Sequence, residues 1–338
     1  MDFILPRQQQ MPQHAPYPPK TAGLGGIPTV HTDIPITVIF LLLFICGAVS
    51  HMTIFQLNKR RGHKFIMSGM MFGFCMARIT TCIMRIVWAT RPHNISVAIA
   101  AQIFVAAGVV LLFVVNLIFA QRIVRAAHPN SGWHPIFKHS FTATYVLIVV
   151  MLIMVIITNV QNFYTLNANT KRIDRAVILT GGTFYTVISF LPFPLVIGGL
   201  LIPRRTRIEK FGSGRFRTKI AVLLTSSFLL CLGAAFRMGT NFKTPRPIND
   251  PPTYFNKGCF YFFNLTVEVL VIFLYVIVRV DLRFHVPDGS KGPGDYSGRN
   301  LADEKEGDMA MRINTEEEVF DDAPAQTSVE RRNGEQRV

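Results

Sequence analysis

The stretch IMSGMMFGFCMARITTCIMRIVWAT, residues 66–90, decides the fold. A helix needs about 20 largely apolar residues to cross a hydrocarbon core of about 30 Å, and this stretch is long enough. It also contains Arg78 and Arg85. An arginine at mid-membrane costs roughly 2.5–3.5 kcal/mol on insertion scales, so it usually lines a protein interior or a water-filled cavity. The stretch therefore predicts a membrane-spanning helix with a charged inner face.

Six further stretches have a similar length and composition. Half of all residues are hydrophobic and only 16% are charged, which is typical of an integral membrane protein and not of a soluble domain. Helices are expected because lipid offers no partner to open backbone groups. The predicted fold is all-α, a polytopic seven-transmembrane helix bundle with these spans: 35–57, 66–90, 97–121, 141–163, 176–202, 219–240 and 258–280.

The bundle is expected to form one compact domain, residues 35–287, with a different segment on each side. Residues 1–34 are rich in Pro, Gln and Gly and predict a disordered extracellular arm. Residues 288–338 hold thirteen Asp+Glu against seven Lys+Arg and predict a disordered acidic cytosolic tail. The opening residues lack the apolar run of a cleavable signal peptide, so the first span is expected to direct insertion.

The basic residues of the loops predict the orientation. Loops 58–65, 122–140 and 203–219 hold four, three and seven Lys+Arg, whereas the alternate loops 91–96, 164–175 and 241–257 hold one, three and three. The richer side is expected to be cytosolic, which places the N-terminus outside and the C-terminus in the cytosol. We expect a membrane location, specifically the plasma membrane. The net charge of +15 follows from these loops, so nucleic acid is not an expected partner.

Four charged residues lie well inside predicted spans, away from the span ends: Arg78, Arg85, Arg237 and Glu268. Arg78 and Arg85 are seven residues apart and share one helix face, separated by roughly 10 Å along the axis. In the predicted topology Arg78 and Glu268 lie at a similar depth, and pairing them is the least costly way to bury both. Arg85 and Arg237 are then expected in the outer half, without an acidic partner.

Two interpretations of these arginines remain open. In the first, Arg85 and Arg237 bind a carboxylate or phosphate, because the planar guanidinium forms bidentate hydrogen bonds with such groups. In the second, they extend to the membrane interface. For the Arg78–Glu268 pair we prefer a structural role, since buried pairs often fix helix packing.

The fifth span contains Pro192 and Pro194, followed by Gly198 and Gly199. Proline removes a backbone donor and clashes with the preceding turn, so the helix should bend or break here. The segment is either a hinge, with opened backbone lining a cavity, or an ordinary kink of a membrane helix.

No enzymatic activity, cofactor or metal is expected. Of nine histidines, only His51 lies within a predicted span, and the chain contains no HExxH, GxSxG, P-loop or GxGxxG pattern. The five cysteines include no CxxC pair and no pair in the predicted outer loops, so neither a redox site nor a disulfide framework is indicated. The body of the seventh span lacks the lysine that a retinal Schiff base needs.

Several segments resemble an uncharacterised fungal seven-helix membrane family whose members are often labelled family-C-like G-protein-coupled receptors. The resemblance extends over most of residues 30–300. It implies a membrane protein without an established activity. The third span ends without an acidic-Arg-Tyr triplet, and the seventh has no Asn-Pro-x-x-Tyr, in contrast to rhodopsin-like receptors. The segments that carry the resemblance are GFCMAR (73–78), IMRIVW (83–88), CLGAAFR (231–237), CFYFFN (259–264) with Glu268, VRVD (278–281) and RFHVPDG (283–289).

These observations lead to three functional hypotheses. The first is a receptor-like sensor of an anionic or lipid-like ligand, with a cytosolic signalling partner at loops 58–65, 122–140 and 203–219 and at the tail. The second is a carrier or exporter of amphipathic or lipid-like anions, with Pro192 and Pro194 as the moving part. The third is a structural membrane protein with no ligand. Membrane lipid is an expected partner under all three hypotheses.

Overall fold

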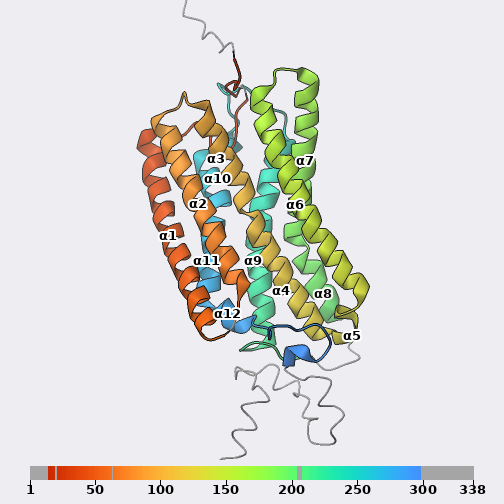
Figure 1. The fold of residues 1–338 in the computed structure, drawn as a ribbon. Coiled ribbons are helices and arrows are strands. Elements are labelled where there is room, and N and C mark those ends of the chain that lie inside the picture. The colour runs from red at the N-terminus through yellow and green to blue at the C-terminus, as the bar shows by residue number, and fades with distance from the viewer. Residues whose placement is uncertain (1–13, 20, 63, 204–207, 298–338) are drawn as a thin grey trace, which may run out of the picture.

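The computed structural model describes residues 14–19, 21–62, 64–203 and 208–297. Within these ranges the chain forms an all-helical bundle without a β-strand, and seven helical segments are long and apolar enough to cross a membrane (Figure 1). The prediction of a seven-helix bundle is therefore confirmed. The predicted tail from residue 298 onwards and residues 1–13 of the predicted arm lie outside the described residues.

The first five spans include two that are divided. The third consists of α3 and α4, and the fifth of α7 and α8. The bounds are α1 (Val30–Arg60), α2 (Ile66–Thr90), α3 (Ile95–Gly108), α4 (Val110–Ala127), α6 (Pro135–Tyr164), α7 (Ala168–Phe190) and α8 (Pro192–Leu201).

The sixth span is a single helix, and the last consists of α10, the π-helical turn η2 and α11. Short elements lie between and after the spans. The bounds are α9 (Phe216–Phe242), α10 (Lys257–Phe260), η2 (Tyr261–Thr266), α11 (Val267–Ile277), α5 (Pro129–Gly132), η1 (Thr253–Phe255), α12 (Val280–Arg283) and η3 (Asp295–Ser297).

Three spans begin five or more residues before their predicted starts, and the fifth, expected from residue 176, begins at Ala168. The first was expected from residue 35 and begins at Val30; the fourth was expected from residue 141 and begins at Pro135. Hydropathy finds the apolar part of a helix, whereas the start depends on local groups. A proline in the first turn loses no intrahelical bond, and an acidic residue such as Asp33 interacts favourably with the helix N-terminus.

The bundle has two ends, which the course of the chain distinguishes. The N-side is the end at which α1 begins, at the top of Figure 1, and the C-side is the end at which the last span finishes. Residues 21–29 run over the N-side and pair with the loop between α9 and α10. Ala22 donates its N–H to the Arg246 carbonyl at 2.9 Å, and Gly25 donates to the Phe255 carbonyl at 3.1 Å. This course differs from the disordered arm that the sequence predicts for residues 1–34.

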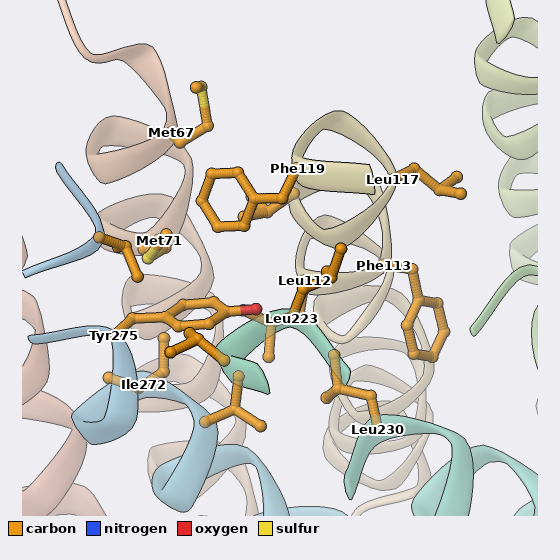
Figure 2. Packing of buried hydrophobic residues seen from close by; sticks show 14 of the residues in the cluster. Met67, Met71, Leu112, Phe113, Leu117, Phe119, Leu223, Leu230, Ile272 and Tyr275 are labelled. Atoms are coloured by element: carbon orange, nitrogen blue, oxygen red, sulfur yellow. The ribbon is translucent and has the colours of Figure 1, made fainter. Parts of the chain in front are cut away.

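Helix α4 lies at the centre of the apolar core. Its side chains Leu112, Phe113 and Phe119 are fully buried and pack against α2, α9 and α11 (Figure 2). Helix α6, in contrast, exposes a run of branched residues, as a helix in contact with lipid does. In a bilayer such a core is stabilised mainly by van der Waals packing, because lipid tails are as apolar as the side chains themselves.

The C-side is closed by an aromatic and basic layer. Phe284 stacks on Phe119 at a centroid distance of 4.2 Å, and its carbonyl accepts a hydrogen bond from Arg122. The buried Lys219, at the start of α9, donates to the carbonyls of Phe211 (2.5 Å) and Gly214 (3.3 Å). The ends of α9 and of the last span are thus connected to the same layer.

Candidate functional site

The last span contributes polar side chains to the interior at three successive levels. Tyr261 and Asn264 lie in the π-helical turn η2, and Glu268 lies in the first turn of α11; all three are buried. Thr266 donates its hydroxyl to the Tyr261 carbonyl five residues earlier, at 3.2 Å. A π-helical turn accommodates one extra residue and occurs frequently at functional sites. These side chains take part in two charged clusters at different depths.

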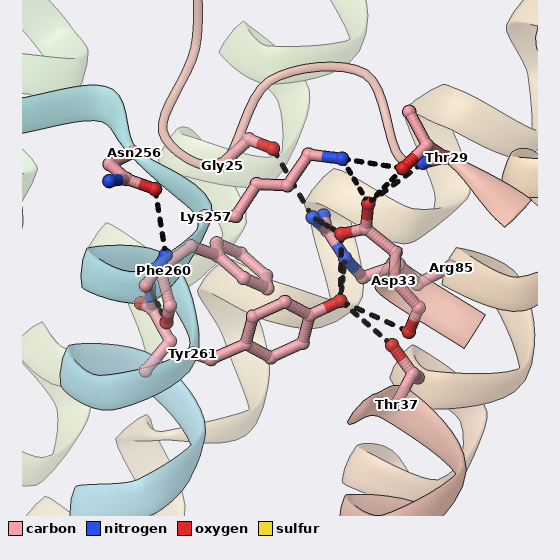
Figure 3. Close-up of polar contacts among 11 residues, drawn as sticks. Gly25, Thr29, Asp33, Thr37, Arg85, Asn256, Lys257, Phe260 and Tyr261 are labelled. Atoms are coloured by element: carbon pink, nitrogen blue, oxygen red, sulfur yellow. Dashed lines mark hydrogen bonds and ion pairs between the residues drawn. The ribbon is translucent and has the colours of Figure 1, made fainter. Parts of the chain in front are cut away.

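The first cluster, called the N-side cluster, consists of Asp33, Arg85, Lys257 and Tyr261 (Figure 3). Three side chains donate to the Asp33 carboxylate: Arg85 at 2.9 Å, Lys257 at 2.6 Å and the Tyr261 hydroxyl at 2.8 Å. The Thr29 N–H donates to the same carboxylate at 2.8 Å. The Asp33 residue is only 1% exposed. The cluster therefore joins α1, α2 and the start of the last span around one carboxylate.

Arg85 is held through two of its three guanidinium nitrogens, Nε and Nη2. Besides Asp33, its guanidinium donates to the Gly25 carbonyl at 3.3 Å and to the Tyr261 hydroxyl at 3.2 Å, and it lies 4.0 Å from the centroid of the Phe260 ring. The expectation that Arg85 lacks an acidic partner is wrong. The reason is that α1 begins at Val30, so Asp33 is part of the bundle and not of a disordered arm.

The second cluster, called the mid-membrane cluster, consists of Arg78, Arg237, Asn264 and Glu268. The structure places Arg78 and Glu268 in bidentate contact, with both nitrogen–oxygen distances at 2.5 Å, and both residues are buried. The remaining Arg78 nitrogen donates to the carbonyls of two α3 residues, Phe104 at 3.1 Å and Val105 at 3.0 Å. Arg78 thus has protein partners for all of its guanidinium nitrogens.

Arg237 is less completely paired. It donates one hydrogen bond to the Asn264 side-chain oxygen at 3.0 Å, and its Nη1 lies 3.9 Å from the Glu268 carboxylate. Its side chain is 21% exposed, against 0% for that of Arg78 and 6% for that of Arg85. The expectation that Arg237 lacks an acidic partner is therefore wrong, because Glu268, expected to pair with Arg78 alone, also lies within ion-pair distance of Arg237. Even so, the guanidinium of Arg237 keeps donors that no other described residue accepts.

Each cluster contains two cations and one carboxylate, so each carries a formal charge of +1. A net charge is expensive inside a low-dielectric interior unless it is neutralised or hydrogen-bonded. In the N-side cluster both cations lie within 2.9 Å of the carboxylate, and Lys257 is in addition 29% exposed. In the mid-membrane cluster the excess charge resides on Arg237, which makes this arginine the group best placed to bind an anion.

The proline segment of the fifth span remains helical. The Leu191 N–H donates to the Val187 carbonyl at 2.9 Å, and the Leu195 N–H donates to the Leu191 carbonyl at 3.3 Å. Pro192 is buried at the start of α8, which packs against α4, and Pro194 follows it in the same turn. The backbone is therefore interrupted only where proline lacks its donor. It does not form the opened stretch that a cavity-lining hinge would require.

Sequence reasoning missed Asp33, Lys257, Tyr261 and Asn264. Asp33 and Lys257 each lie just before a predicted span, so they counted as loop residues. Their opposite charges at the N-side ends of two spans were a usable signal. Across the described part of the chain, no group of three or more His, Cys, Asp or Glu side chains is arranged to hold a metal ion.

Comparison with known proteins gives one match. A family model described as "Protein of unknown function (DUF3112)" matches residues 209–285. This segment contains α9, the last span and α12, and hence Arg237, Asn264, Glu268 and Tyr261. No curated protein and no solved structure matches the chain. The chain is thus a seven-helix, membrane-type protein that is similar, over its sixth and seventh spans, to a family whose description states no function.

Proposed function

We propose that the protein is a receptor-like sensor, similar to G-protein-coupled receptors in architecture, that binds an anionic or lipid-like ligand through Arg237. The observation that carries this proposal is the incomplete pairing of Arg237: one hydrogen bond to Asn264, a distance of 3.9 Å to Glu268, and a side chain that is 21% exposed. The ligand class is an organic carboxylate or phosphate, because a guanidinium with free donors binds these groups through two parallel hydrogen bonds.

Arg85 has a different role from the ligand contact expected from the sequence. Its Nε and Nη2 donate to Tyr261, Gly25 and Asp33, and its side chain is only 6% exposed, so a ligand at Arg85 would have to compete with a buried carboxylate. We assign a structural role at the N-side to Arg85 and the ligand-binding role to Arg237. The ligand's negative charge neutralises the excess +1 of the mid-membrane cluster, which provides the binding energy.

Ligand binding reaches the C-side through two helices. Arg237 belongs to α9, and its partners Asn264 and Glu268 belong to the last span. An anion that draws Arg237 away from Glu268 changes the contact between these helices, and both end in the C-side layer around Lys219 and Phe284. We place this layer in the cytosol at the plasma membrane, where loops 58–65, 122–140 and 203–219 and the tail meet a signalling partner. The proposal contains no catalytic step.

The test is native mass spectrometry of the gently purified protein in wild-type and Arg237→Gln forms. Arg246→Gln is the matched control, because it removes one positive charge from an exposed pair outside both clusters. We expect a co-purifying anion on the wild type and the control that is absent from Arg237→Gln. Equal occupancy in all three proteins would refute the site. Nucleotide exchange on a co-expressed G protein, with and without the anion, then tests signalling.

A carrier of amphipathic or lipid-like anions is the second candidate. The observation in its favour is the interruption between α7 and α8, where Pro192 and Pro194 remove two backbone donors from a span that packs on α4. If the protein is a carrier, the anion that co-purifies with the wild type should cross the membrane of proteoliposomes that contain the protein. The double variant Pro192→Ala with Pro194→Ala should slow this transport. A sensor binds the anion without flux. The two functions are therefore separated by one transport assay.

A further inference from the structure

A groove of about 450 Å³ lies between α6 and α7, away from both charged clusters. Its walls are apolar except for Thr180 and for Arg172, which lies at the rim near the N-side end of α7. The groove lining includes Met151 and Met154 from α6, and Arg172, Ala176, Val177 and Thr180 from α7.

The two walls are held in a fixed relation. Beside the groove, α6 and α7 touch at Gly181, where an added Cβ would lie 2.4 Å from the nearest side-chain carbon of Val155 and 3.8 Å from Met151. Only a glycine allows this approach. The small Ala176 leaves space on the α7 wall, and methionine side chains adapt to irregular apolar ligands.

The charge at the rim is uncompensated. Arg172 is exposed and has no hydrogen-bond or ion-pair partner among the described residues, whereas Arg175, one turn further, donates to the Lys243 carbonyl at 3.0 Å. The nearest acidic residue, Asp174, is buried and lies two positions away, about 200° around the helix from Arg172. Its carboxylate therefore faces away from the groove.

We propose that this groove binds one anionic phospholipid, with its phosphate on Arg172 and an acyl chain along Ala176, Val177 and Thr180. The depths fit this occupant. Arg172 is the fifth residue of α7, about 6 Å from the N-side end of the helix, which is the level of the head groups. Thr180 lies about 12 Å deeper, in the hydrocarbon region. The site is independent of Arg237 and of the ligand proposed there.

The experiment measures which lipid the full-length protein retains. The protein is reconstituted in vesicles of phosphatidylcholine with a minor fraction of phosphatidylglycerol, extracted into mild detergent and examined by native mass spectrometry. We expect a preference for phosphatidylglycerol of about fivefold, as one cation near a membrane surface provides. Arg172→Gln should abolish the preference, and Lys171→Gln, an equal loss of charge beside the groove, should keep it.

Two further variants guard against indirect effects. Ala176→Phe fills the groove from an exposed position, so the protein stays folded and should lose the retained lipid of either class. Arg237→Gln should leave the preference unchanged, which separates this site from the proposed function. Equal preference in wild type and Arg172→Gln would overturn the proposal. So would a dimeric wild type that Ala176→Phe makes monomeric, because a second copy would then occupy the groove.

Discussion

The N-side cluster and the mid-membrane cluster each bring two cations to one carboxylate, but they distribute the charge differently. At the N-side, Asp33 lies within 2.9 Å of both Arg85 and Lys257. At mid-membrane, Arg78 takes both oxygens of Glu268, and Arg237 remains at 3.9 Å. In the N-side cluster the carboxylate is therefore bonded to both cations and links the helices. In the mid-membrane cluster one cation, Arg237, keeps donors that can bind another group.

Removal of the central carboxylate should have the largest effect. Glu268→Ala leaves the buried Arg78 and the partly exposed Arg237 without a counter-charge, and breaking a buried pair such as Arg78–Glu268 costs about 3–5 kcal/mol. We expect a strong decrease in the thermal unfolding temperature in nanodiscs, monitored by circular dichroism. Leu270→Ala, two residues away on an exposed position, is the control and should change little.

A charge swap tests directly whether Arg78 and Glu268 are partners. In Arg78→Glu with Glu268→Arg, the new glutamate faces the carbonyls of Phe104 and Val105, which now accept hydrogen bonds from Arg78. The double variant should therefore fold better than either single variant but less well than the wild type. Expression no higher than that of the single variants would show that the two residues are not partners.

The N-side cluster should respond to Asp33→Asn with an intermediate loss. The amide keeps the shape but removes the charge that Arg85 and Lys257 share, and an unsatisfied buried group costs about 1–3 kcal/mol. Hydrogen exchange should also increase in residues 21–29, because Gly25 is held by Arg85. Asp250→Asn removes an exposed carboxylate and is the control. An effect as small as in that control would mean that the cluster does not fix the N-side.

The comparison predicts a smaller effect for Arg237 than for Arg85. Arg85→Gln removes four contacts from a buried centre, whereas Arg237→Gln removes one hydrogen bond and a loose ion pair. We expect less than about 1 kcal/mol for Arg237→Gln, the scale of one net hydrogen bond, and a clearly lower unfolding temperature for Arg85→Gln. The reverse order would assign the structural role to Arg237 and would remove the basis for a ligand there.

The smallest effect is expected at the C-side pair of Arg279 and Asp281. Burial raises the pKa of the Asp281 carboxyl, but hydrogen bonds from Arg279 and Asn58 outweigh it and hold the pKa below its ordinary value. The stabilisation is therefore complete above the ordinary pKa of about 3.9 and is lost as the pH falls through the lower folded-state pKa. Because Arg279 is 45% exposed, we expect at most about 1 kcal/mol.

This last value is measured by comparing wild type and Asp281→Asn between neutral and acidic pH. The difference in unfolding temperature between them should diminish as the pH falls. A constant difference would show that the charge of Asp281 does not contribute.

The fold could be predicted from the sequence because each span is long, apolar and separated from the next by polar residues. The proximity of Arg78 and Glu268 followed from helix rise alone, which places both near the middle of their spans. The N-side cluster could not be predicted in this way. Asp33 lies ahead of the apolar stretch of α1, and hydropathy cannot indicate that polar residues extend a helix. Arg237 was expected in the outer half beside Arg85, without an acidic partner, whereas it lies with Glu268 in the mid-membrane cluster. Its incomplete pairing depends on Arg78 using both oxygens of Glu268.

The π-helical turn η2 makes this part of the chain sensitive to insertion or deletion of a residue. Each residue of an α-helix turns the following segment by about 100°. Tyr261, the first residue of η2, belongs to one cluster, and Glu268, two residues after the end of η2, belongs to the other. Deletion of a single residue from η2 would rotate one of these side chains away from its partners while the other stayed in place. The number of residues from Tyr261 to Glu268 thus fixes the angle between these two side chains around the helix axis. Insertions or deletions in this segment should therefore be far less tolerated than substitutions.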